Sequence, residues 1–204
     1  MTEPCRIIGV LDNGADGLTP AALDHLHRAQ VVIGGHRTLD LFRPQFGANT
    51  LTHDLTGQLT AVPDWIRQAR ADGLRTVVLA TGDPLCHGIA EFLIRKLGAD
   101  VCEVLPNVST LQWAFARLGL SWHDAGVCSV HSQDAGEWTS GAGPAHGLYP
   151  VLRAVTQHDK LVIFTGPANT PDRIARLLKA EGFAAEFRLS VASCLLQTEE
   201  QVIG

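Results

Sequence analysis

The sequence predicts an α/β protein, and three observations lead to this prediction. Short apolar runs alternate with helical patterns along the first half of the chain, which is typical of a parallel sheet with right-handed crossovers. A threonine cap followed by proline starts a helix twice, at Thr19-Pro20 and at Thr170-Pro171. The 204 residues, 46% of them hydrophobic and 18% charged, are enough for one large domain or two modest ones.

The first half of the chain, residues 1–118, is expected to form one domain. Its strands are predicted at residues 5–10, 31–33, 49–51, 76–80 and 101–105. Its helices are predicted at residues 20–29, 36–42, 60–72, 88–97 and 109–118. Gly73 and Gly119 stand where helices are expected to end, because glycine readily adopts the left-handed conformation of a C-cap.

The second half, residues 119–204, is expected to form the other domain. Strands are predicted at residues 127–131, 160–164, 185–193 and 199–203, and helices at 151–157 and 171–181. Residues 134–150 are rich in glycine and are expected to be a loop that acts as a lid. The chain stops inside the last apolar run, which indicates a fragment of a longer polypeptide.

Composition excludes several classes of function. A net charge of −5 without a Lys/Arg cluster argues against nucleic-acid binding. No apolar run reaches the length of about 20 residues that a membrane span needs, and no signal peptide is recognisable. Five cysteines without a CxxC pair indicate reduced, mostly buried thiols in a cytoplasmic protein. Nine histidines without an HxxxH or HExxH pattern make a metal site unexpected.

The turn after the strand at 76–80 is the most informative stretch of the chain. Gly82 allows backbone to approach a ligand closely, and Pro84 stiffens the turn. Asp83 then provides a fixed acceptor, better suited to an ammonium or hydroxyl group than to a phosphate. The alternative is an ordinary strand-to-helix turn in which Asp83 only caps the next helix.

Two more strand-end turns accompany it. The first loop reads Gly9-Val10-Leu11-Asp12-Asn13-Gly14, which lacks the middle glycine of a dinucleotide fingerprint and so disfavours a nicotinamide-dependent oxidoreductase. The third turn, residues 106–110, contains Ser109, either a helix cap or part of a carboxylate site at a helix start. Acidic turns together with a helix start favour an amino-acid-like ligand.

These motifs together resemble the tetrapyrrole (corrin/porphyrin) methylase family, along nearly the whole chain. T-G-D-P-x-x-x-G at 81–88 and P-x-x-S at 106–109 carry the likeness to the superfamily. G-G-x-R at 34–37 and N-T-P at 169–171 point to its CbiE-type branch, the N-terminal domain of precorrin-6Y C5,15-methyltransferases. Leu11 departs from the pattern, because the family has a glycine there.

The resemblance implies a fold and an activity. It implies two α/β domains, an N-terminal parallel sheet and a C-terminal mixed sheet, with the active-site cleft between them. It also implies an S-adenosylmethionine-dependent methyltransferase that acts on carbon 5 of a corrin precursor, at the precorrin-6/7 stage of cobalamin biosynthesis. Members are typically homodimers, and many are fused to a CbiT-type methyltransferase that also decarboxylates.

The resemblance also carries individual positions. The residues that match the family's cofactor contacts are Thr81, Gly82, Asp83, Cys86, Ser109, Thr110, Thr165 and Leu195. Asp12 and His131 are the predicted catalytic residues, because both stand at strand ends and either could relieve positive charge on the macrocycle; His87 ranks below them. For His131 the alternative is a hydrogen bond within its own domain.

The substrate carries several carboxylates, so its pocket should contain cationic side chains. Arg37 and Arg117 are the predicted substrate-binding residues, with Arg43 as a further candidate, against the alternative of a solvated surface role for each. Two other functions stay open: a family member that methylates another macrocycle position, and a non-catalytic module that binds the cofactor or a corrinoid, which the altered first loop favours.

Overall fold

The computed structural model describes residues 3–131 and 136–204, and the chain separates into two compact units. Unit 1 comprises residues 1–110 and 195–198, and unit 2 comprises residues 111–194 and 199–204. The division falls at the start of helix α5 (Thr110–Leu118), whereas the predicted domain boundary lies at the end of that helix. No helix of the described residues is long and apolar enough to cross a membrane.

Unit 1 is built on a five-stranded sheet in which every pair of neighbouring strands is parallel, as predicted. The strand order is β3-β2-β4-β1-β5. The strands are β1 (Cys5–Val10), β2 (Val31–Gly34), β3 (Leu51–Asp54), β4 (Thr76–Thr81) and β5 (Cys102–Leu105). The central strands are buried on both faces, which explains why they read as continuous apolar runs.

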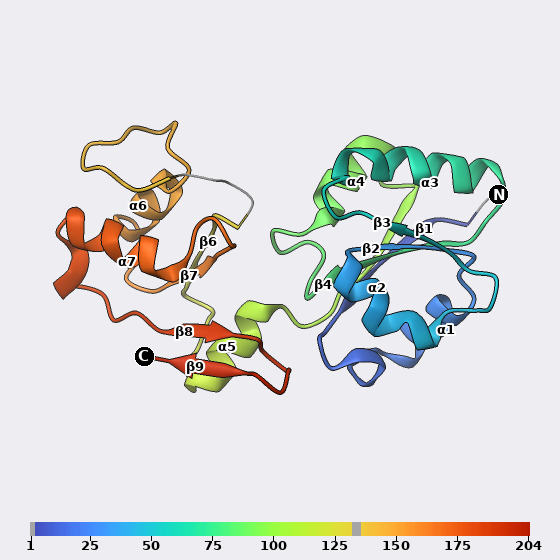
Figure 1. Ribbon diagram of the computed structural model, residues 1–204, viewed down its shortest axis with the longest axis horizontal. Coiled ribbons are helices and arrows are strands. Elements are labelled where there is room, and N and C mark those ends of the chain that lie inside the picture. Colours follow the sequence, from blue (N-terminus) through green and yellow to red (C-terminus); the bar gives the residue numbers. More distant parts are fainter. Residues whose placement is uncertain (1–2, 132–135) are drawn as a thin grey trace. The chain divides into compact units, whose positions relative to one another are not determined.

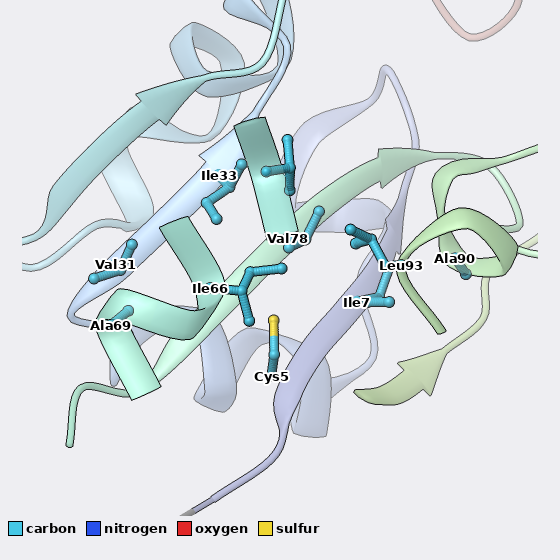
Figure 2. Close-up of a cluster of buried hydrophobic side chains, with 10 residues drawn as sticks. Cys5, Ile7, Val31, Ile33, Ile66, Ala69, Val78, Ala90 and Leu93 are labelled. Carbon is cyan, nitrogen blue, oxygen red and sulfur yellow. The ribbon is translucent and has the colours of Figure 1, made fainter. Parts of the chain in front are cut away.

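Helices cover both faces of this sheet (Figure 1). Helices α3 (Val62–Ala71) and α4 (Ile89–Leu97) pack on one face, and α1 (Pro20–His27) and α2 (His36–Phe42) on the other. Successive strand residues point to opposite layers, so Ile7 packs under α3 and α4 while Ile8 packs under α1 and α2. Figure 2 shows the first of these two cores, in which strand side chains meet Ile66, Ala69 and Leu93.

Local capping chemistry sets the helix ends, with one correction. The Thr19 hydroxyl accepts a hydrogen bond from the Ala22 N–H at 3.2 Å, as a cap at this position should. Gly73 has φ +69° and lets the Leu74 N–H reach the Ala69 carbonyl at 2.9 Å, as predicted for the end of α3. Thr170 was expected to cap α7 (Pro171–Ala180) in the same way, but its side chain makes no capping bond to the helix backbone.

Unit 2 contains two small sheets instead of the single mixed sheet that was predicted. Strands β6 (Gly126–Ser129) and β7 (Leu161–Phe164) form a parallel pair, with α6 (Tyr149–Val155) and α7 packed beside them. Strands β8 (Val191–Ser193) and β9 (Gln201–Ile203) form a separate antiparallel pair.

The cause of this error is the segment predicted as a strand at 185–193. Its first residues continue the turn that follows α7, because Phe183 and Phe187 pack against the core of unit 2 and against each other, with ring centroids 6.3 Å apart. This folds residues 183–185 into a short 3₁₀ helix and leaves a strand of three residues at Val191–Ser193.

The predicted lid at 134–150 is anchored to unit 2 near both ends of its described part, which begins at Gly136, whereas residues 139–141 and 143–145 are exposed; residues 134 and 135 lie outside the described residues. Trp138 and Leu148 are buried in the core of unit 2. The Trp138 indole donates to the Glu181 carboxylate at 2.8 Å. Glu137 accepts hydrogen bonds from Arg173 and Arg176 of α7. The apolar anchors were overlooked because the glycine-rich composition dominated the prediction.

Candidate functional site

The topology of unit 1 defines a candidate ligand-binding edge. From β1 the chain crosses through α1 to β2, and from β4 it crosses through α4 to β5, on the other side of β1. The neighbouring strands β1 and β4 therefore send their connections in opposite directions and onto opposite faces of the sheet. Ligands of open α/β sheets bind at such a switch point, outside the carboxyl ends of the strands.

Gly9 fixes the distance between the loops that meet at this edge. A Cβ atom added to Gly9 would lie 2.3 Å from the Gly82 carbonyl oxygen and 2.7 Å from the Asn107 nitrogen, so no other residue fits there. The Gly82 N–H in turn donates to the Val10 carbonyl at 2.7 Å. The loops after β1, β4 and β5 are therefore in direct contact, as the sequence predicts.

Asn107 holds the same three-loop junction with its side chain. Its Nδ2 donates to the carbonyl oxygens of Gly9 at 3.1 Å and Gly17 at 2.8 Å, and its Oδ1 accepts from the Val108 N–H at 2.8 Å. Sequence reasoning did not assign this role to Asn107. The available signal was an amide residue directly after a strand end, where its side chain can satisfy loop backbone.

The loop after β4 presents Asp83 without using it as a helix cap. The Oδ1 atom of Asp83 accepts from the Leu85 N–H at 2.9 Å, which closes a turn within the loop. The N-cap of α4 is Gly88, so the alternative role of Asp83 as that cap is wrong. Thr81 is exposed at the end of β4, and Cys86 is half-buried in the same loop.

Ser109 and Thr110 lie beside this loop. A Cβ atom built on Gly82, whose φ is +70°, would lie 3.4 Å from both the Ser109 Cα and the Thr110 nitrogen. Ser109 is buried, and Thr110 is the first residue of α5. Two exposed apolar side chains flank the contact, Leu85 at 55% and Val108 at 40% exposure. Six of the eight predicted cofactor residues are thus gathered at one edge of unit 1.

Asp12 is held by two donors. Arg37 Nη1 lies 3.0 Å from Asp12 Oδ2, and Gln197 Nε2 donates to the same oxygen at 2.7 Å. The predicted catalytic carboxylate and the predicted substrate arginine therefore form an ion pair. The Leu11 side chain is only 6% exposed, so the residue that replaces a glycine points into the protein and adds no bulk to the surface.

Leu195 belongs to unit 1 although it stands near the end of the sequence. It is half-buried in a tight turn whose neighbours have positive φ angles, 51° for Cys194 and 66° for Leu196. Non-glycine residues in this conformation carry backbone strain, which concentrates at functional positions. Nothing in the local sequence indicated this conformation.

Two predicted site residues lie in unit 2, the catalytic candidate His131 and the cofactor candidate Thr165. They follow the carboxyl ends of β6 and β7, and both are exposed. His131 Nδ1 lies 2.5 Å from Ser129 Oγ, a hydrogen bond within its own unit, as the alternative for His131 expected. Asn169 is completely buried and donates to the Val130 carbonyl at 2.9 Å. Sequence reasoning treated Asn169 only as part of a motif.

Arg117 is engaged with this chain's own carboxylate. Its Nη2 lies 3.2 Å from Glu200 Oε2, and its guanidinium lies 5.2 Å from the centre of the Trp113 ring. The hydrogen bond that Arg117 donates to the Glu200 carboxylate raises the pKa of Arg117 above its ordinary value. Arg43 similarly pairs with Asp40 at 3.0 Å. Of the three arginines considered for the substrate, Arg37 is the one placed at the strand-end loops.

Comparisons with known proteins agree with this architecture. The family model described as Tetrapyrrole (Corrin/Porphyrin) Methylases matches residues 5–203. A protein of Salmonella typhimurium named cobalt-precorrin-7 C(5)-methyltransferase is 31% identical over 176 residues, which cover 86% of this chain and 78% of that protein. The decarboxylating precorrin-6Y C(5,15)-methyltransferase of Mycobacterium tuberculosis is also 31% identical, over 86% of this chain but 40% of its own length.

Solved structures share the fold. The methyltransferase CobJ superposes with a TM-score of 0.74 at 20% identity, over 98% of this chain and 84% of its own. The precorrin-6Y methylase CbiE of Archaeoglobus fulgidus superposes with a TM-score of 0.63 at 21% identity, over 98% of this chain and 87% of its own. At these identities the likeness establishes the α/β fold with its parallel sheet.

Proposed function

The chain belongs to the tetrapyrrole methylase family, and on that premise we propose that it transfers a methyl group from S-adenosylmethionine to carbon 5 of a precorrin at the precorrin-6/7 stage of cobalamin biosynthesis. One observation carries the proposal: the Gly82–Asp83 turn and the start of α5 meet at the topological switch point of the sheet. The names of the relatives support the position of methylation, because both contain carbon 5.

The residues at this edge fit the methyl donor. Leu85 and Val108 offer exposed apolar surface of the kind that a purine ring covers. Asp83 has one oxygen occupied by the Leu85 N–H, which leaves the other for a hydroxyl or ammonium group. The backbone N–H groups at the start of α5 suit the carboxylate of the methionine moiety. The loops after β1, β4 and β5 lie close together because Gly9 has no side chain to separate them.

The protein's task in this chemistry is mainly to position the reactants. When bound, S-adenosylmethionine supplies a methyl group that its sulfonium has already activated. Ordering two reactants can lower a barrier by about 7–11 kcal/mol. The meso carbon of a reduced tetrapyrrole is the nucleophile, and the macrocycle becomes more positive as the methyl group arrives. Asp12 stabilises that charge, and Arg37 binds a substrate carboxylate while it orients Asp12.

The remaining assignments extend the same proposal. Thr165 and Leu195 contribute further cofactor contacts, and His131, oriented by Ser129, assists Asp12. Arg117 assists in substrate binding after exchange of its Glu200 partner. The enzyme works as a cytoplasmic homodimer, beside a CbiT-type methyltransferase that is fused to it or associates with it.

A methyl-transfer assay tests the proposal. The protein is incubated with precorrin substrate and S-adenosylmethionine that carries a trideuterated methyl group. We expect one labelled methyl group per macrocycle, located at carbon 5 by NMR. A product labelled at another position would instead support a relative with different specificity. Binding of S-adenosylhomocysteine without any transfer would contradict the proposed reaction and favour a non-catalytic binding module.

A paired substitution tests the cofactor loop within the same experiment. Asp83→Ala should weaken binding of S-adenosylhomocysteine about tenfold or more, because it removes a charged hydrogen-bond acceptor. Asp100→Ala is the matched control, since this exposed aspartate precedes β5 at the opposite edge of the sheet. Titration calorimetry on both variants checks the prediction. Equal affinities would contradict the assignment of Asp83.

A further inference from the structure

Gln197 has a polar side chain to which the proposed function assigns no role. Its Nε2 group donates to Asp12 Oδ2 at 2.7 Å, in a partly buried hydrogen bond between residues 185 positions apart in the sequence. Both residues belong to unit 1, where residues 195–198 return to the strand-end loops. Because charged acceptors make the stronger hydrogen bonds, this contact is more than an incidental surface pair.

The two donors leave Asp12 with one oriented oxygen. Arg37 and Gln197 both reach Oδ2, and neither bonds to Oδ1. The Asp12 carboxylate is 19% exposed, so its rotation is restricted by packing as well as by these bonds. A carboxylate tied at one oxygen from two directions presents the other oxygen in a fixed direction, which is the geometry that a positioned acceptor requires.

The turn that carries Gln197 is itself constrained. Cys194 and Leu196 both adopt positive φ angles, a strained conformation for non-glycine residues that persists only where the surrounding structure enforces it. Leu195, a predicted cofactor contact, stands two residues before Gln197 in the same turn. The turn therefore connects Leu195, a predicted cofactor contact, with Asp12, the predicted catalytic carboxylate.

We infer that Gln197 is a positioning residue for methyl transfer, which acts through Asp12 by fixing the direction of its free oxygen. This role rests on the proposed function, because it has meaning only if Asp12 faces the macrocycle. Arg37 is the weaker constraint of the two, since its side chain is 62% exposed and is shared with the substrate in the proposed complex. Gln197 keeps Asp12 in place while Arg37 also binds a substrate carboxylate.

Two substitutions separate the hydrogen-bond donor of Gln197 from the length of its side chain. Gln197→Met keeps the length of the side chain and removes the donor. Gln197→Glu also keeps the length but replaces the donor with a second carboxylate that repels Asp12. Gln157→Met is the matched control, because Gln157 is exposed at the end of α6 in unit 2. Each variant is assayed for kcat, KM, S-adenosylhomocysteine affinity and the pH dependence of kcat.

Carbon-13 NMR adds a readout that does not depend on turnover. The aspartate carboxyl carbons are labelled, and Asp12→Asn identifies the signal of Asp12. We expect the chemical shift of this signal to change in Gln197→Met and in Gln197→Glu, which lose the hydrogen bond to Asp12, and to stay the same in Gln157→Met. We also expect kcat to fall about 10- to 100-fold in both Gln197 variants, and S-adenosylhomocysteine affinity to stay within about twofold.

Three results would overturn the inference, and they differ from one another. An Asp12 signal with the same chemical shift in all variants would show that Gln197 does not hold the carboxylate. A changed signal with wild-type kcat would show that the contact is structural only. If the wild-type protein binds S-adenosylhomocysteine but transfers no methyl group, the proposed function fails, and the role of Gln197 fails with it.

Discussion

Each unit places an asparagine at the carboxyl end of a parallel strand pair, but the two side chains are satisfied differently. In unit 1, Asn107 donates twice to loop carbonyls and accepts once from backbone. In unit 2, Asn169 is completely buried and donates once, to the Val130 carbonyl. Within the described part of the chain its Oδ1 atom has no partner. A buried acceptor without a partner is costly and rare in folded proteins.

The difference indicates which of the two units contributes more to ligand binding. The strand-end loops of unit 1 are fixed by a saturated set of hydrogen bonds and by the close contact at Gly9, so that their shape exists before a ligand arrives. In unit 2 the Asn169 side chain uses only its donor, and its buried acceptor makes no hydrogen bond within the described part of the chain. We therefore expect unit 1 to supply most of the cofactor affinity.

The largest effects should follow from filling the glycine contacts of the two units. Gly9→Ala brings a Cβ within 2.3 Å of the Gly82 oxygen, and Gly166→Ala brings one within 2.3 Å of the His131 oxygen. Each should lower the free energy of unfolding by about 3 kcal/mol. Only Gly9→Ala should also abolish S-adenosylhomocysteine binding. Gly143→Ala, which meets no atom within 4 Å, is the control. Chemical denaturation and calorimetry measure both, and equal losses of affinity would remove the asymmetry.

Replacing either asparagine should lower stability by less than the glycine substitutions do, and Asn107→Ala should cost more than Asn169→Ala. Asn107→Ala leaves two loop carbonyls without their donor and should cost about 2–3 kcal/mol of stability. Asn169→Ala loses one hydrogen bond but also removes an unpartnered acceptor, so it should cost about 1 kcal/mol. Urea denaturation with a constant m-value tests the order. A greater cost for Asn169→Ala would contradict the comparison.

Stability at alkaline pH should depend on the buried thiols of the two units, Cys5 in unit 1 and Cys128 in unit 2. Burial raises the pKa of the Cys5 thiol from 9.0 to about 12, so the unfolded chain releases this proton first as the pH rises. The free energy of unfolding should fall by about 1 kcal/mol between pH 9 and pH 10 and continue to fall toward pH 12. Burial also raises the pKa of Cys128 in unit 2. Cys5→Ala should remove more of the alkaline loss than Cys128→Ala, and the reverse order would be inconsistent with the burial of Cys5.

The smallest effect should be a loss of stability at acidic pH that arises from an ion pair in unit 2. Hydrogen bonds from Arg176 lower the pKa of the Glu137 carboxyl below its ordinary value. The stability from this pair is therefore present above about pH 4.5 and lost as the pH falls. Because Glu137 is exposed, the loss should be small and should shrink further in high salt. Acid denaturation of wild type and Glu137→Gln checks this, and identical curves would show that the pair contributes nothing.

The sequence was most informative where local chemistry decides the structure. Strands β1, β2 and β4 of unit 1 are buried apolar runs closed by glycine or by polar turns, so their order along the chain was readable, and β1 occupies Cys5–Val10 as predicted. The edge strand β3 starts later than expected, at Leu51, because Thr50 closes a turn on Gly47 and bonds to the Ala29 carbonyl.

The candidate site was readable in one part and hidden in another. The loop at Thr81–Cys86 and the turn at Ser109–Thr110 each carry a motif, and parallel strands bring their ends together by geometry. The contact of Gln197 with Asp12 depends on how a distant turn returns to the sheet, which no local pattern encodes. The packing of Trp138 into unit 2 was hidden for the same reason.

A crystal structure with S-adenosylhomocysteine bound would show whether the strand-end loops of unit 1 hold the cofactor. We expect ligand density against Thr81–Cys86 and Ser109–Thr110, at the carboxyl ends of β1, β4 and β5. Density elsewhere would contradict this expectation, for example in the surface hollow between α3 and α4 that Pro63, Arg67, Phe92 and Arg95 line.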